Sequence, residues 1–146
     1  MGVEITHLQT SFHTDDSKVC AYAEWVMSRV AGLTPEVSWH ELSLVLTDDS
    51  IRSLNQSWFG KDSVTDVISF AYPEEGFGEV IVNLQQAVEE GRLRESPDHE
   101  LALYIAHGCH HLTGAEDDTP EKKAEMLSLE EEWVRDSGAL AGGLFR

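Results

Sequence analysis

Two histidines stand four residues apart in 107-HGCHHLTGAED-117, followed by a glycine and a group of acids. On a helix, His107 and His111 would leave one face about one turn apart, roughly 5–6 Å between their Cβ atoms. Their ring nitrogens can then bind one metal ion at about 2.0–2.1 Å. Gly114 stands where such a helix would end and turn, so that Asp117 can return as a third ligand. The pattern H-x3-H-x2-G-x2-D leaves a coordination position for water.

The residues around this pattern leave the third ligand open. Glu116 and Asp118 flank Asp117, and spacing alone does not choose among the three. His110 projects about 60° and about 100° away from the two predicted ligands on a helix of 3.6 residues per turn. We therefore expect it to line the wall of the site or to support the ligands. Cys109 follows the apolar spacing of the helix and is expected in the core.

Two histidines and one carboxylate with open positions suit a hydrolytic metal site, because the metal activates water and polarises a carbonyl or phosphoryl oxygen. Non-haem iron enzymes use the same ligand set. The spacing also resembles the metzincin protease helix, H-E-x-x-H-x-x-G-x-x-H. Position 108 is glycine rather than glutamate, so the general base of such a protease is absent.

The elements that must position these residues follow from the apolar pattern. Strands are expected at 3–12, 37–46, 66–72 and 79–83, the last two as an antiparallel pair across a glycine-rich turn. Helices are expected at about 19–32, 51–60, 84–91, 97–112 and 120–136, the last two starting at Ser96-Pro97 and Thr119-Pro120. This order predicts an α+β fold, a small mixed β-sheet covered by helices, with the metal site on one helix and the following loop.

Composition narrows the class of protein. A chain of 146 residues favours one domain, here 1–136, with 137–146 as a flexible, glycine-rich C-terminal tail. The net charge of −17 argues against broad affinity for nucleic acid, and no DNA partner is expected. Two cysteines are too few for a disulfide framework, no segment resembles a signal peptide, and no run approaches the ~20 apolar residues of a membrane span. A cytoplasmic protein without membrane contact is expected.

Two sequence blocks resemble one family. The motif HG-x-x-HL-x-G is similar to the signature of the YbeY endoribonuclease family, the bacterial rRNA maturation factors. The stretch 55-NQSWFGKDSVTDVISF-70 resembles that family's N-x-x-(aromatic)-R-G-K-D-x-x-T-D-V-L-S-F block, and 78-GEVIV-82 stands where the family has its G-D-I-x-I strand. The matches run in order from about Leu42 to Trp133.

The resemblance implies a metal-dependent, single-strand-specific endoribonuclease, a hydrolase acting in 16S rRNA 3′-end maturation and ribosome quality control. It implies one divalent metal ion, by our interpretation Zn²⁺, held by His107, His111 and the residue at position 117. Ribosomal RNA and the small ribosomal subunit, or associated assembly factors, would be the partners. The second block places Lys61, Thr65 and Asp66 beside the cleft as substrate-binding residues, although Thr65 and Asp66 equally suit a turn and a strand cap.

The chain departs from the family pattern at four positions. Asp117 replaces a histidine, Phe59 replaces an arginine, His110 replaces an apolar residue and Ala71 stands where proline commonly follows Ser-Phe. The loss of the arginine removes a bidentate phosphate partner. Two alternative functions therefore remain open: a ribosome-assembly factor without catalysis, and a metallohydrolase with a non-RNA substrate.

Overall fold

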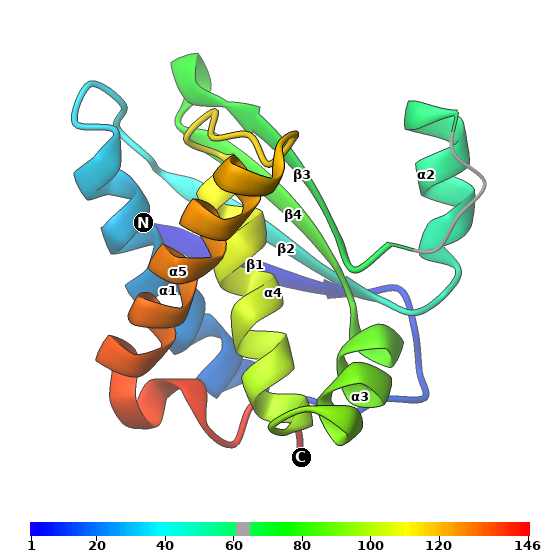
Figure 1. The fold of residues 1–146 in the computed structure, drawn as a ribbon. Helices are drawn as coiled ribbons and strands as arrows, with labels where there is room; N and C mark the ends of the chain where they lie inside the picture. Colours follow the sequence, from blue (N-terminus) through cyan, green and yellow to red (C-terminus); the bar gives the residue numbers. More distant parts are fainter. Residues whose placement is uncertain (61–64) are drawn as a thin grey trace.

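The computed structural model describes residues 1–60 and 65–146. Within these ranges the chain forms one four-stranded sheet and a set of helices (Figure 1). The strands are β1 (Gly2–His7), β2 (Glu41–Thr47), β3 (Val67–Tyr72) and β4 (Phe77–Asn83). The α-helices are α1 (Asp16–Leu33), α2 (Ile51–Phe59), α3 (Leu84–Leu93), α4 (Pro97–His111) and α5 (Pro120–Ser137), with short 3₁₀ turns at Pro73–Glu75 and Gly138–Ala141.

The sheet is mixed, with strand order β1-β2-β4-β3. β1 and β4 both run parallel to the central β2, whereas β3 pairs antiparallel with β4. The antiparallel pair is the hairpin that the sequence predicts, and its turn closes at Gly76, whose φ of 64° suits a residue without a Cβ. β3 is therefore an edge strand, since no further strand among the described residues pairs with its outer side.

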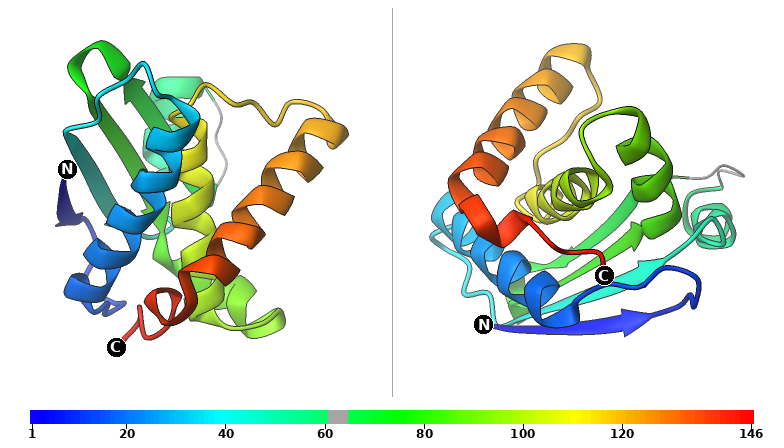
Figure 2. Two further views of the ribbon diagram at one scale, coloured as in Figure 1. Left: turned by 90° about the vertical axis from the view of Figure 1, so that its left-hand side faces the viewer. Right: turned by 90° about the horizontal axis from the view of Figure 1, so that it is seen from below.

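The two faces of the sheet carry separate apolar clusters, as the strand period of two requires. Leu42, Leu44 and Leu46 point to one face and pack with α1 and α4, while Val45 points to the opposite face with the first residue of α2, Ile51. The end of this strand is therefore buried on both sides, which agrees with the apolar alternation of Leu42, Leu44 and Leu46 and with Val45 between them. α5 packs outside α1 and α4, so two layers of helices cover this face of the sheet, as the right-hand view of Figure 2 shows.

The observed α+β architecture, a four-stranded mixed sheet with helices packed on it, confirms the predicted fold class. In α1, predicted at about 19–32, the apolar residues spaced three and four apart are all buried: Val19, Tyr22, Ala23, Val26, Met27 and Val30. The predicted caps of α4 and α5 are also present, because the side chains of Ser96 and Thr119 accept hydrogen bonds from the third residue beyond each cap. Among the described residues no helix has the length and apolarity to cross a membrane.

Two predicted strands have different bounds in the structure. The first was expected over 3–12, yet it ends at His7, because the Gln9 side chain bonds both the N–H and the C=O of Phe12 and turns the chain away. The second was expected over 37–46, yet it begins at Glu41. Val37 is instead part of a turn that hydrogen-bonds back to Thr34, and within residues 1–60 and 65–146 both neighbouring strands pair with this segment only from Glu41 onward.

The segment 137–146, expected as a flexible tail, is packed against the body of the protein. Leu144 is fully buried, and Phe145 forms a β-bridge with Thr14. The carboxylate of Asp98, at the start of α4, accepts hydrogen bonds from the backbone N–H groups of Gly143 and Phe145 at 2.9 and 2.8 Å. The glycine-rich composition of this segment suggested flexibility. The contacts that hold it depend on Asp98 and Thr14, which are far away in the sequence.

Candidate metal centre

Helix α4 carries both predicted histidine ligands on its last turns. Ser96 caps its first turn and Pro97 occupies the first helical position, so the start of the helix is fixed and the histidines fall at its end. The helix stops at His111. Gly114 then adopts φ of 89°, a conformation that favours glycine, and the chain folds back along the helix to Asp117. The carboxylate of Asp117 thereby reaches the two imidazole rings.

Three atoms converge at this point. The Nε2 atoms of His107 and His111 lie 3.1 Å apart, and the Asp117 Oδ2 atom lies 3.3 Å from the first and 3.5 Å from the second. Ligands at about 2.0–2.1 Å from one ion in tetrahedral geometry would be separated by about 3.3 Å. The spacing of these three donors therefore matches the edges of a tetrahedral metal site, and the group could hold a metal ion.

Hydrogen bonds at the Nδ1 atoms, on the side of each ring away from the three-donor group, fix the orientation of the two imidazoles. The Nδ1 atom of His111 lies 2.8 Å from the carbonyl oxygen of Ala115, and the Nδ1 atom of His107 lies 2.9 Å from Glu130 Oε1. Both partners only accept hydrogen bonds, so each Nδ1 carries a proton and, in the neutral ring, each Nε2 presents a lone pair. Two lone pairs facing each other at 3.1 Å repel unless a cation or a proton lies between them.

Glu130, on α5, was not among the residues predicted for the site. Its carboxylate is 1% exposed and accepts hydrogen bonds from His107 and, at 2.7 Å, from the Nδ1 of His110. His110 thus bonds the same carboxylate that holds His107, and it lies away from the three-donor group, as its helical angle predicted. The signal for Glu130 was present in the sequence, because it stands between Met126 and Trp133 in the buried stripe of α5, where an acid is expected only with a partner.

The same contacts shift two pKa values in opposite directions. Burial by itself lowers the pKa of His107, but the hydrogen bond and the charge of Glu130, with further charges from Asp66 and Asp117, raise it above its ordinary value. Burial by itself raises the pKa of Glu130, but the hydrogen bonds from His107 and His110 lower it below its ordinary value. Glu130 is therefore held as a carboxylate that increases the basicity of His107.

A close approach between α4 and the sheet holds the histidines beside β3. A Cβ added at Gly108 would lie 2.5 Å from Val80 Cγ1 and 2.7 Å from Val67 Cγ2, so a larger residue would fit only if the valines or the helix shifted. The Ser69 hydroxyl donates a 2.8 Å hydrogen bond to the carbonyl oxygen of Gly108. The glycine of the HG pair, which removed the protease interpretation, has this packing role.

The geometry separates the three acids that competed for the third ligand. Glu116 and Asp118 both face Lys122, whose Nζ lies 3.8 and 3.2 Å from their carboxylate oxygens. Asp117 between them faces the histidines. Because neighbouring residues of this loop point to opposite sides, one acid reaches the imidazoles and the other two form exposed ion pairs.

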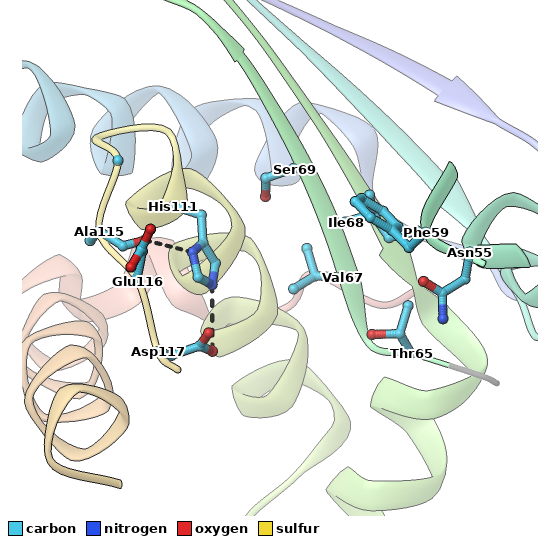
Figure 3. A pocket seen from close by; sticks show the side chains of 11 residues that line it. Asn55, Phe59, Thr65, Val67, Ile68, Ser69, His111, Ala115, Glu116 and Asp117 are labelled. Carbon is cyan, nitrogen blue, oxygen red and sulfur yellow. Dashed lines mark hydrogen bonds and ion pairs between the residues drawn. The ribbon is translucent and has the colours of Figure 1, made fainter. Parts of the chain in front are cut away.

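A cleft of about 520 Å³ opens beside this group, around the edge of β3. His111, Glu116 and Asp117 line one side, and Asn55 and Phe59 of α2 line the other, as Figure 3 shows. Val67, Ile68 and Ser69 of β3 lie between the two sides, with Ile68 also part of the sheet core.

The three residues predicted to bind substrate have different positions. Thr65 lines the cleft. Asp66 lines a neighbouring polar cavity with Arg94 and Tyr104, and its backbone carbonyl accepts a hydrogen bond from Asn83, as expected of a residue capping the strand. Lys61 lies outside the described residues.

Fold and site together define an α+β protein with two helix-borne histidines and a loop carboxylate grouped at one edge of the sheet. A sequence model of the family described as Endoribonuclease YbeY matches residues 4–138. The chain belongs to the YbeY family.

Curated relatives named "Endoribonuclease YbeY" agree with this assignment. The protein from Exiguobacterium sp. is 32% identical over 126 residues, which cover 75% of this chain and 80% of the relative. The protein from Myxococcus xanthus is 39% identical over 122 residues, 75% of this chain but 40% of the relative. A relative from Anaeromyxobacter sp. is matched over 58% of its length, so the chain spans about half of these two longer proteins.

The fold also occurs in a solved structure. The solution structure of TM1509 from Thermotoga maritima superposes with a TM-score of 0.57 at 23% sequence identity, over 92% of this chain and 91% of that one. At this identity the match concerns the fold.

Proposed function

We propose that this protein is a metal-dependent endoribonuclease specific for single-stranded RNA, with His107, His111 and Asp117 as the metal ligands. The observation that carries the proposal is the pair of Nε2 atoms at 3.1 Å, each with its Nδ1 committed to an acceptor and with Asp117 Oδ2 beside both. Membership of a family whose curated relatives are named endoribonucleases supports the RNA substrate.

The donor set fits zinc. Two imidazoles and one carboxylate with an open fourth position are used in zinc hydrolases, and the donor spacing suits a tetrahedral ion. A divalent ion bound there would supply Lewis-acid activation of water and of a phosphoryl oxygen. Iron accepts the same ligands, so the metal is an outcome of the experiment below.

The residues of the chain have distinct tasks in this proposal. Glu130 and the carbonyl of Ala115 hold the two imidazoles in the tautomer that presents Nε2, because both accept a proton-bearing Nδ1. Asp117 contributes the negative charge that offsets part of the charge of the ion. In this proposal the single-stranded substrate lies in the cleft of about 520 Å³ around the edge of β3, with one phosphodiester beside the ligands.

We further propose that the natural substrate is ribosomal RNA, with cleavage in 16S rRNA 3′-end maturation and a role in ribosome quality control. The partners are then the small ribosomal subunit or its assembly factors, and the compartment is the cytoplasm. The support is the family assignment. It predicts that the protein co-sediments with small subunits from a lysate and that its loss leaves 16S precursors with unprocessed 3′ ends.

The deciding experiment compares matched variants of the purified protein. His111→Ala and Asp117→Ala should lower the metal content measured by elemental analysis and should abolish cleavage of a single-stranded RNA. A duplex RNA of the same sequence should remain uncleaved by the unmodified protein and by every variant. His99→Ala, on the same helix, and Asp118→Ala, beside Asp117, are the controls, because neither side chain belongs to the three-donor group. Both controls should keep metal and activity.

The alternatives give different results in the same assay. Equal cleavage by a metal-free His111→Ala preparation would sink the metal mechanism. Stoichiometric metal with co-sedimentation but no cleavage would favour an assembly factor. Metal without any RNA association, together with Asp117-dependent hydrolysis of another substrate, would favour a metallohydrolase with a non-RNA substrate.

A further inference from the structure

The C-terminal turn of α2 exposes two aromatic side chains. Trp58 is 48% exposed and Phe59 is 49% exposed, although both belong to the residue types that proteins usually cover. Both rings contact Phe70 of β3. The Phe59 ring lies parallel to it, with an interplanar angle of 8° and centroids 6.1 Å apart, and Trp58 meets it edge-on at 4.9 Å. The Phe59 ring is thus held in a fixed plane while half of its surface stays accessible.

This ring belongs to the wall of the cleft described above. Phe59 lines it from α2, opposite His111 and Asp117, with the edge of β3 between them (Figure 3). An isolated exposed aromatic residue needs no explanation. An aromatic ring held parallel to a neighbour, on the wall of the cleft across β3 from His111 and Asp117, is placed to contact a bound substrate.

The charge of the cleft indicates which part of an RNA strand it contacts. The described lining residues include the acids Glu116 and Asp117 and neither lysine nor arginine, and the whole chain carries −17. RNA-binding grooves commonly attract the phosphate backbone with basic residues. The described lining has no lysine or arginine side chain to attract phosphate. Its residues can therefore add binding energy only through contacts with other parts of the RNA, such as the bases. Stacking of bases on aromatic rings has that property.

We propose that Phe59 is the platform on which a nucleobase of the single-stranded substrate stacks, extending the parallel Phe59–Phe70 pair, with Trp58 flanking it. The inference rests on the proposed function, because it names how that site recognises RNA. It makes Phe59 a specificity-determining residue: an unpaired base can leave its own stack and cover the ring, whereas a base within a duplex cannot. Discrimination against duplex RNA follows from this contact.

The test measures equilibrium binding of a non-cleavable 2′-O-methyl oligonucleotide of about ten nucleotides to the metal-loaded protein. Phe59→Leu removes the aromatic face but keeps an apolar side chain, and should weaken binding about ten-fold. Phe59→Trp should retain or improve it. Tyr72→Leu is the matched control, because Tyr72 is 45% exposed on the same strand as Phe70 but does not line the cleft. It should bind as the unmodified protein does, and all variants should keep the same metal content.

A salt titration separates stacking from phosphate attraction. Phe59→Arg should bind with a steeper salt dependence, the slope of log K against log salt changing by about 0.7 for one new phosphate contact. An oligonucleotide with one abasic position should lose affinity for the unmodified protein but not for Phe59→Leu. Affinity of Phe59→Leu equal to that of the unmodified protein would overturn the inference and would indicate that the ring serves another partner, such as a protein.

The two proposals fail in different ways. If the unmodified protein binds the oligonucleotide in a Phe59-dependent manner but cleaves no RNA, the stacking platform stands and the nuclease proposal falls. If it cleaves RNA and Phe59→Leu leaves both affinity and KM unchanged, the nuclease proposal stands and the platform falls. An unmodified protein without measurable affinity for the oligonucleotide overturns the platform.

Discussion

Replacing the buried carboxylate of Glu130 by an amide should weaken metal binding although none of the three proposed ligands is replaced. In Glu130→Gln one oxygen remains to accept from His107 or His110, and the NH₂ group faces the other ring. An imidazole facing that donor must turn its Nδ1 lone pair toward it, which moves its proton to Nε2. For His107 that proton occupies the position where a metal ion would bind.

The magnitude follows from the contacts that are lost. Partners that hold a metal-bound histidine are worth about 10–100-fold in metal affinity, which corresponds to about 1.4–2.8 kcal/mol. Loss of a charged hydrogen bond at a site that is 1% exposed should also lower the free energy of unfolding of the metal-free protein by about 2 kcal/mol. Both effects come from the same carboxylate, so they should appear together.

The assay is zinc competition against a chelator of known affinity, with urea unfolding of the metal-free protein in parallel. Glu131→Gln is the matched control, since its side chain is exposed on the same helix, and it should change neither quantity. A Glu130→Gln protein that loses stability but keeps its zinc affinity would refute the positioning role of Glu130 and leave it as a structural residue.

Three further predictions concern the packing of Gly108, the protonation of His107 and the burial of Leu144. Gly108→Ala should destabilise the protein by about 1–3 kcal/mol in urea unfolding, because its Cβ would overlap Val80 and Val67, and unchanged stability would contradict the close approach of α4 to the sheet. Metal affinity should fall as the pH drops through the pKa of His107. That pKa is raised by Glu130 in the metal-free protein, so protons should compete with the metal at a higher pH than at an ordinary histidine. A flat pH profile by calorimetry would count against His107 as a ligand. Leu144→Ala should lower the free energy of unfolding by about 2–5 kcal/mol, since this side chain is fully buried, whereas a truly loose tail would show no effect.

Much of the fold could be predicted because its signals are local. The α1 stripe, the Ser96-Pro97 and Thr119-Pro120 helix starts and the glycine-closed hairpin each depend on residues within a few positions of one another. The docked tail depends on contacts with Asp98 and Thr14, which lie far along the chain. The strand ends differ because of short side-chain and turn contacts at Gln9 and Thr34, which the apolar pattern does not encode. Periodicity carries no information about where a partner strand ends.

The candidate site divides in the same way. The spacing of His107, His111 and Gly114 determined by itself that two imidazoles share a helix face and that the chain turns back after them, because helix geometry is a local property. Only the tertiary structure decided the rest: that Asp117 rather than its neighbours faces the rings, that Glu130 from α5 holds His107 from behind, and that the cleft wall across β3 includes Phe59. These contacts join elements whose packing depends on the whole core, and no spacing within one segment encodes them.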